Sequence, residues 1–187
     1  MGDEVAKPII NMQGERVALG PRRRELMPLY EKWMNDFDTL QLAGYPMEAR
    51  TTDELTAWFE RTTAENRLVQ FDVYEIETWR PIGFTMLKDI DTYHRTAEFG
   101  ISISEPEYRG KGYGTEATKL MFRYGFMELN LNRIQTKDFE ENIGGWRADE
   151  KAGMKFEGRL RQSMFRFGKY HDERVYSILR SEFLESF

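Results

Sequence analysis

The feature that most constrains the fold is a glycine-rich loop between a strand pattern and a helix pattern. Alternating apolar residues over Ala97–Ser104 predict a half-buried strand, and Pro106 ends it. The loop Arg109–Gly114 that follows holds three glycines and two cations. Apolar residues at helical spacing then predict a helix from Thr115 to about Glu128. The order of strand, glycine-rich loop and helix predicts an anion-binding turn.

The backbone of this loop favours a phosphate ligand. The first amides of a helix have no partner inside the helix, and the helix dipole adds partial positive charge there. Glycines leave the loop amides accessible, while Arg109 and Lys111 add full charges. We therefore predict a site for a phosphate or pyrophosphate group. The nucleotide-hydrolase loop does not fit, since Lys followed by Ser or Thr is missing after Gly114, and the dinucleotide fingerprint fails at Thr115.

The remaining patterns place this unit in an α+β domain. The expected order is β-α-α-β-β-β-α-β-α-β-β, which is typical of a mixed, mostly antiparallel sheet flanked by helices. The crossover through the central helix gives one parallel strand pair. The expected elements are a strand at 16–19, helices at 25–35 and from a capping box at 51–54 to about 67, strands from 69, at 82–88 and at 97–104, a helix at 115–128, a strand at 133–137, a helix at 142–151, and a hairpin of strands at 154–167 and 174–180 around a turn at 168–173.

Length and composition set the frame. The chain of 187 residues fits one domain, expected over 14–187 after a flexible arm at 1–13. The absence of Cys excludes a disulfide, a thiolate metal site and a Cys nucleophile. We find no secretory signal and no apolar run near the roughly 20 residues of a membrane span, so a cytoplasmic protein without a membrane partner is expected. A net charge of −5 argues against nucleic-acid binding by bulk electrostatics.

The two histidines do not form a metal-binding pattern. His94 is expected in a loop and His171 in the turn of the last hairpin. Isolated histidines without Cys or clustered Asp make no metal site, so no metal is expected.

The loop and a second block further along the chain both resemble a known family. The run Arg109–Ala117 resembles the acetyl-coenzyme A pyrophosphate loop of the GNAT superfamily of N-acetyltransferases, written Gln/Arg-x-x-Gly-x-Gly/Ala. The block Asn142–Met154 resembles the Asn…Glu-Lys-x-Gly-Phe stretch of the same enzymes. The runs Ala97–Ile101 and Gly144–Arg147 are similar to the branch that contains ribosomal-protein N-terminal acetyltransferases, polyamine acetylases and drug-resistance acetylases.

The resemblance implies a GNAT-like fold with acetyl-CoA as co-substrate. It implies that the strand before the loop pairs with the pantetheine arm, that the loop amides hold the pyrophosphate, and that Asn142 reaches the cofactor from the far side. A plain helix N-cap explains Asn142 equally well. The cofactor-binding residues expected on this basis are Ile101, Ser102, Ile103, Arg109, Gly110, Lys111, Gly112, Tyr113, Gly114, Thr115, Asn142 and Arg147.

Glu98 and Asp149 are the candidate catalytic residues. A primary amine titrates near pH ~10, so it must lose a proton before it attacks a thioester. Glu98 is the candidate general base, with an ion-paired strand-end residue as the alternative. Many family members have Tyr at the position of Asp149, and the branch named above has Ser near Gly145. Asp149 is therefore a candidate acid or substrate contact, with a solvated residue and protonation of the thiolate by water as the alternatives.

The expected acceptor is the primary amine of a small cationic molecule. The acetyl group is expected to pass to it directly from acetyl-CoA in a ternary complex. Acids and aromatic residues in the helical region suit such a ligand. They are Trp33, Asp36, Asp38, Tyr45, Glu48, Asp53 and Trp58. The alternatives are a protein N-terminus as acceptor and a non-catalytic acyl-CoA-binding module. A homodimer is a possible assembly.

Overall fold

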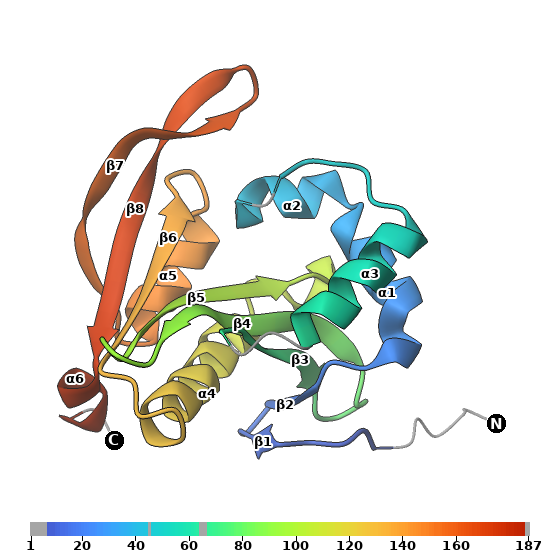
Figure 1. Cartoon of the computed structure of the whole chain (residues 1–187), viewed down its shortest axis with the longest axis horizontal. Helices are drawn as coiled ribbons and strands as arrows, with labels where there is room; N and C mark the ends of the chain where they lie inside the picture. Colours follow the sequence, from blue (N-terminus) through green and yellow to red (C-terminus); the bar gives the residue numbers. More distant parts are fainter. Residues whose placement is uncertain (1–6, 45, 64–66, 186–187) are drawn as a thin grey trace.

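The computed structural model describes residues 7–44, 46–63 and 67–185 of the chain (Figure 1). An eight-stranded sheet runs in the order β1-β2-β3-β4-β5-β6-β8-β7. Its strands are β1 (Met12–Gln13), β2 (Val17–Pro21), β3 (Val69–Glu75), β4 (Pro81–Asp91), β5 (Thr96–Ile103), β6 (Arg133–Phe139), β7 (Lys155–Arg166) and β8 (Lys169–Leu179). The helices are α1 (Met27–Met34), α2 (Phe37–Ala43), α3 (Thr52–Thr63), α4 (Tyr113–Met127), α5 (Ile143–Lys151) and α6 (Arg180–Glu185).

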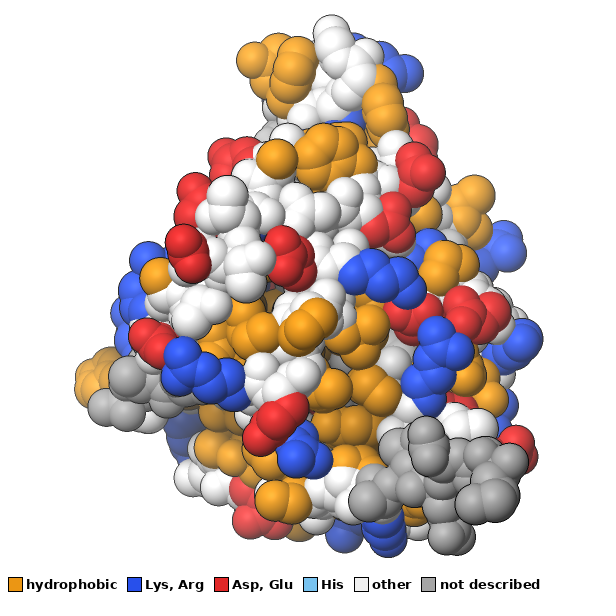
Figure 2. All heavy atoms as spheres, turned by 90° about the vertical axis from the view of Figure 1, so that its right-hand side faces the viewer, with side chains coloured by type: hydrophobic (Ala, Val, Ile, Leu, Met, Phe, Trp, Pro, Cys, Tyr) orange, Lys and Arg blue, Asp and Glu red, His pale blue; other side chains and the backbone are white. Residues whose placement is uncertain are grey.

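Two apolar clusters hold helices against the sheet. In the larger cluster, Phe122 of α4 packs edge-on against Phe99 of β5, with ring centroids 5.1 Å apart. In the smaller cluster, Tyr30 and Trp33 of α1 pack with Phe84 of β4 and with α3. Figure 2 shows the side of the molecule that carries α1 and α3, where acidic and basic side chains are mixed across the surface. Helices thus pack against the sheet through both clusters.

The expected α+β fold class and order of elements are confirmed, with three additional elements. The β5–β6 pair is parallel, as the crossover rule predicts, and the other neighbouring strands are antiparallel. The additions are β1, α2 and α6. Of these, α2 carried a readable signal: Asp36 caps its start by accepting from the Thr39 amide, and Gly44 ends it at φ 73°.

The last two residues of the expected N-terminal arm form a short strand. Met12 and Gln13 pair with Leu19 and Ala18 as strand β1, and residues 1–6 lie outside the described part of the chain. The strand expected at 16–19 is β2, and it extends further than expected, because Gly20 and Pro21 stay in register with β3. Pro21 is the last residue of β2 and lies beyond the pairing with β1, which reaches only to Leu19, so Pro is tolerated there.

The last hairpin turns earlier than expected. Arg166 pairs with Lys169, so the turn is two residues long, and the predicted turn at 168–173 is wrong. Phe167 and Gly168 both have positive φ, 51° and 74°. This is the conformation that two-residue hairpins require, because it matches the twist of the strands. His171 consequently lies within β8, where it is 7% exposed, and not in a turn.

The capping box at the start of α3 is confirmed. The Glu54 amide donates to Thr51 Oγ1 at 3.3 Å, and the Thr51 amide donates to Glu54 Oε2 at 2.9 Å. The helix ends at Thr63, and the expected extension through 64–66 lies outside the described residues.

We expect Thr51→Ala to lower the free energy of unfolding by about 1 kcal/mol, because it removes the side-chain acceptor from the first turn of α3. Urea unfolding measures the change. Thr56→Ala is the matched control, since the Thr56 hydroxyl only bonds the Thr52 carbonyl inside the same helix. Equal stability of the Thr51 variant and the wild type would contradict the capping role.

Candidate active site

The strand β5 has an open edge at the centre of the sheet. Its register with β6 ends at Glu98 and Gln135, although β5 continues to Ile103 and β6 to Phe139. The other edge of β5 stays paired with β4 as far as Ile103. Residues 99–103 therefore lack a strand partner toward β6. Unpaired strand edges present N–H and C=O groups in a row, and an extended ligand pairs with them as an added strand would.

The glycine loop leads from this edge to the N-terminus of α4. Gly112 is the N-cap of α4 at φ 88°, and Gly110 has φ 70°. Both values lie in the left-handed region, where glycine carries no steric penalty. The first amides of α4 have no partner within the helix, so they face whatever occupies the loop. The local sequence thus builds a backbone anion site.

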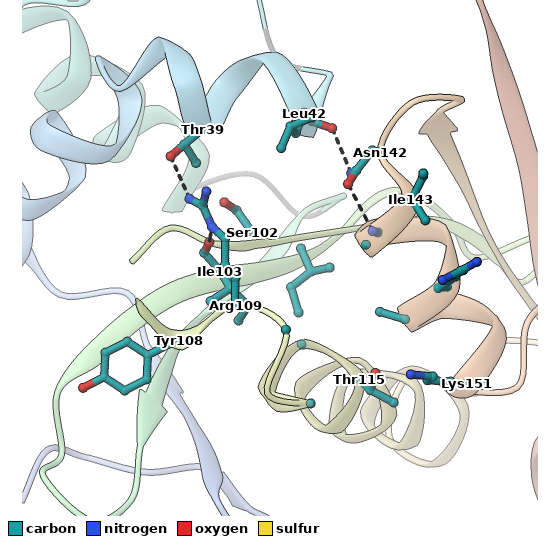
Figure 3. Close-up of a pocket in the computed structure, with 18 of the residues that line it drawn as sticks. Thr39, Leu42, Ser102, Ile103, Tyr108, Arg109, Thr115, Asn142, Ile143 and Lys151 are labelled. Atoms are coloured by element: carbon teal, nitrogen blue, oxygen red, sulfur yellow. Dashed lines mark hydrogen bonds between the residues drawn. The ribbon is translucent and has the colours of Figure 1, made fainter. Parts of the chain in front are cut away.

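A cavity of about 510 Å³ lies between β5, the loop, α2 and α5 (Figure 3). Because glycine has only backbone, the walls that Gly110, Gly112 and Gly114 form are backbone surface. Two expected cofactor residues, Lys111 and Tyr113, are not among the lining residues in the described chain. Ten of them line the cavity: Ile101, Ser102, Ile103, Arg109, Gly110, Gly112, Gly114, Thr115, Asn142 and Arg147.

The side chain of Arg109 is held by the protein itself. Its Nε donates to the Ile103 carbonyl at 2.7 Å, and its guanidinium donates to Thr39 Oγ1 at 2.7 Å and to the Ser104 carbonyl at 3.1 Å (Figure 3). The guanidinium therefore fastens the end of β5 to α2. Its charge still lies at the cavity wall, while Nε and Nη2 already donate to oxygens of the protein.

Asn142 is a helix N-cap that also lies at the cavity. Its Oδ1 accepts from the Gly145 amide at 3.1 Å, which makes it the N-cap of α5, and it also lines the cavity. Its Nδ2 donates to the Leu42 carbonyl of α2 at 2.9 Å (Figure 3). Helix α2 is thus tied to both sides of the cavity, by Arg109 on one side and Asn142 on the other.

Glu98 does not lie with the cavity-lining residues. Its carboxylate pairs with Lys88 Nζ at 2.8 Å and Lys137 Nζ at 3.5 Å. Burial alone would raise the pKa of Glu98, but the bonds and charges of these two lysines lower it below 4.5 on balance. A carboxylate with a lowered pKa that already pairs with two cations is a weak base, so the geometry favours the ion-paired alternative.

Asp149 is buried, and the expectation of a solvated residue is wrong. It is 3% exposed on the inner face of α5, where it meets Asp138 of β6. Burial raises its pKa well above 3.8, and the charge and hydrogen bond of Asp138 add to the effect. Burial also raises the pKa of Asp138 to about 6. Each carboxyl therefore favours its neutral form more than an exposed Asp does, and neither lines the cavity.

This pair predicts a pH-dependent stability. A carboxyl whose pKa is raised in the folded state stabilises the fold at low pH, and the contribution is lost as pH rises from about 4 through the folded pKa. We expect Asp149→Asn to keep the hydrogen bond and remove one charge. The variant should gain stability over the wild type progressively as the pH rises above ~4.

Urea unfolding between pH 4 and 8 measures the effect, and Asp38→Asn at an exposed position is the control. A constant difference in the free energy of unfolding across this range would contradict the raised pKa values of this pair.

A pair formed by Glu141 and His171 was missed from the sequence. Among the described residues, Glu141 is the one carboxylate that lines the cavity. Its Oε1 lies 2.7 Å from His171 Nδ1, and His171 Nε2 lies 3.1 Å from the Arg166 carbonyl. The ring is buried against Phe139. The placement of His171 in a turn hid this contact, because the true register of β8 brings it beneath the β6–α5 connection.

The aromatic residues expected on the acceptor side are structural. Trp33 is buried and donates to Glu105 Oε1 at 2.7 Å, and Trp58 lies beside the guanidinium of Arg22. Neither lines the cavity, and Tyr45 lies outside the described residues. Of the acids expected there, Asp36 caps α2. The others, Asp38, Glu48 and Asp53, are exposed.

The described residues contain neither a candidate membrane span nor a candidate metal cluster. No helix in 7–44, 46–63 or 67–185 is both long and apolar enough to span a membrane. The same residues contain no group of three or more His, Asp or Glu side chains placed to hold a metal ion.

The open strand edge and the amide-walled loop suit an extended arm that ends in a diphosphate. A coenzyme A thioester consists of such an arm and such a diphosphate. The fold and the site therefore define an acyl-CoA-dependent acyltransferase architecture. Residues 16–155 match the family model described as Acetyltransferase (GNAT) domain. The chain belongs to this acetyltransferase family.

Relatives of known structure and name are similar across this domain. The spermidine N(1)-acetyltransferase of Escherichia coli K12 is 38% identical over 102 residues, which cover 54% of each chain. The spermidine N(1)-acetyltransferase of Vibrio cholerae is 33% identical over 132 residues, covering 71% of this chain and 75% of the relative. The first curated relatives are thus matched over about half of their length.

A crystal structure of the Vibrio cholerae spermidine N-acetyltransferase in complex with CoA and spermine superimposes with a TM-score of 0.85 at 27% identity, over 91% of this chain and 99% of the other.

Proposed function

We propose that this protein is an N-acetyltransferase that moves the acetyl group of acetyl-CoA directly to a primary amine of a small cationic molecule. The observation that carries the proposal is the continuity of the open β5 edge with the backbone walls of Gly110, Gly112 and Gly114. An arm paired along 99–103 ends at the N-terminus of α4, where its diphosphate meets free amides and the positive end of the helix dipole.

The transfer needs one base and no covalent enzyme intermediate. The amine nitrogen, once deprotonated, attacks the thioester carbonyl carbon and forms the C–N bond. The nitrogen of the tetrahedral intermediate loses its excess proton to water, the intermediate collapses, the C–S bond breaks, and CoA leaves as a thiolate. The thiolate is protonated by water, because the Asp138–Asp149 pair does not line the cavity.

We assign the role of base and amine contact to Glu141 in place of Glu98. Glu141 lines the cavity with half of its side chain exposed, and His171 fixes the position of its carboxylate. A carboxylate at this wall attracts a protonated amine and then accepts its proton. Polyamines are the first acceptors to test, since the relatives named above are spermidine acetyltransferases and one of them binds spermine with CoA.

Release of free thiol from acetyl-CoA tests the proposal. The panel of acceptors contains spermidine, spermine, an aminoglycoside and short peptides with free N-termini, and the control lacks an acceptor. We expect turnover with polyamines. Turnover with peptides alone would support the protein N-terminal acetyltransferase. Thermal stabilisation by acetyl-CoA without thiol release for any acceptor would support the non-catalytic module.

A further inference from the structure

We propose that Arg16 is a positioning residue for the diphosphate site, an inference that rests on the proposed function. Arg16 lies in the turn between β1 and β2, far from the loop in sequence. Its guanidinium donates to the Lys111 carbonyl at 2.8 Å and from Nε to Glu116 Oε2 at 3.1 Å. Arg16 does not line the cavity, so it acts from behind the loop wall.

The first contact fixes the direction of a peptide group. A loop carbonyl that turned toward a diphosphate would repel it, because both are negative. The bond from Arg16 holds the Lys111 carbonyl on the side away from the cavity. The same guanidinium packs on Gly112, where Nη2 lies 2.9 Å from the position of an added Cβ. Arg16 therefore supports the loop at the residue that caps α4.

The second contact compensates a negative charge beside the anion site. Glu116 stands in the first turn of α4, so its carboxylate is close to where the diphosphate binds. Besides Arg16 Nε, it accepts from the amides of Arg16 at 2.8 Å and Val17 at 3.3 Å. These donors hold the charge against the β1–β2 turn and reduce its repulsion of a phosphate.

The backbone of the β1–β2 turn lies close to the Glu116 carboxylate. A Cβ at Gly14 would lie only 2.4 Å from Glu116 Oε1, so the turn approaches the carboxylate as closely as a glycine permits. The Gly14 amide closes the turn by donating to the Val17 carbonyl at 2.8 Å. The β1–β2 turn thus holds the carboxylate of Glu116, and Arg16 connects this turn to the glycine loop.

Titration with CoA and with S-acetylpantetheine, the cofactor arm without phosphates, tests the role of Arg16. We expect Arg16→Met to weaken CoA binding by at least about tenfold, the loss of a hydrogen bond to a charged group, and to leave S-acetylpantetheine binding unchanged. Arg16→Met with Glu116→Gln should recover part of the loss. Arg24→Met is the control, because Arg24 makes an exposed pair with Glu60.

Each result decides between distinct claims. Wild-type CoA affinity in folded Arg16→Met, or an equal loss of both ligands, would overturn the positioning role. If Arg16→Met does not fold, Arg16→Lys keeps the charge but cannot bond both partners, and an unchanged CoA affinity there would overturn it as well. Failure of the wild type to bind CoA would instead overturn the proposed function itself.

Discussion

Gly112→Val is expected to weaken CoA binding by more than about 100-fold, comparable to the loss of two charge-assisted hydrogen bonds. A β-branched residue resists the φ of 88° found here, and its Cβ would press on the Arg16 guanidinium at 2.9 Å. The N-cap of α4 must then move, and the loop amides turn with it. Isothermal titration with CoA measures the loss.

Gly168→Val controls for backbone strain alone. Gly168 has a similar φ of 74°, but a Cβ there meets no atom within 4 Å, and it lies in the hairpin turn away from the cavity. We expect this variant to lose stability and keep wild-type CoA affinity. A folded Gly112→Val protein with wild-type affinity would show that the loop does not grip the diphosphate.

Glu141→Gln is expected to lower kcat/KM for the acceptor by about 100-fold or more, the usual range for removal of a general base. The amide keeps the shape of the side chain and a contact with His171, but it cannot accept the proton of an amine. The KM for acetyl-CoA should stay unchanged, because the loop is untouched. Steady-state kinetics with the acceptor found in the thiol-release panel measure both quantities.

Glu98→Gln is the matched control for this variant. It makes the same chemical change on the residue that the sequence favoured as base, which here pairs with Lys88 and Lys137. We expect a rate within a few fold of the wild type. A pH–rate profile altered in Glu98→Gln and unaltered in Glu141→Gln would return the role of base to Glu98.

Local signals in the sequence predicted most of the fold and most of the residues that line the cavity. The glycine loop, the capping box at Thr51 and the alternation in β5 each depend on residues close together in the chain, which short-range physics decides. Their order then fixed the parallel β5–β6 pair through the handedness of crossovers. The open edge followed from the family resemblance, and the register that ends at Glu98 and Gln135 displays it.

The parts that sequence could not predict depend on contacts between distant residues. Glu141 and His171 meet only because β8 begins at Lys169, directly after a two-residue turn. This turn lacks the usual Asn-Gly signal, so the sequence did not reveal it. Nothing local to Glu98 indicates that it pairs with two lysines from neighbouring strands. Asp149 is buried at the helix–sheet interface, and its pKa is raised further by Asp138 of β6, which is distant in sequence. In each case the partner, and not the residue itself, determines the chemistry.

The central claim is that the turn entering α4 binds the diphosphate of a CoA thioester through its main chain. A crystal structure of the complex with CoA tests it most directly. The account predicts phosphate oxygens within hydrogen-bond distance of the amides between Gly110 and Thr115, and the pantetheine arm along residues 99–103 of β5. A structure in which CoA binds elsewhere, with this loop free of phosphate, would contradict it.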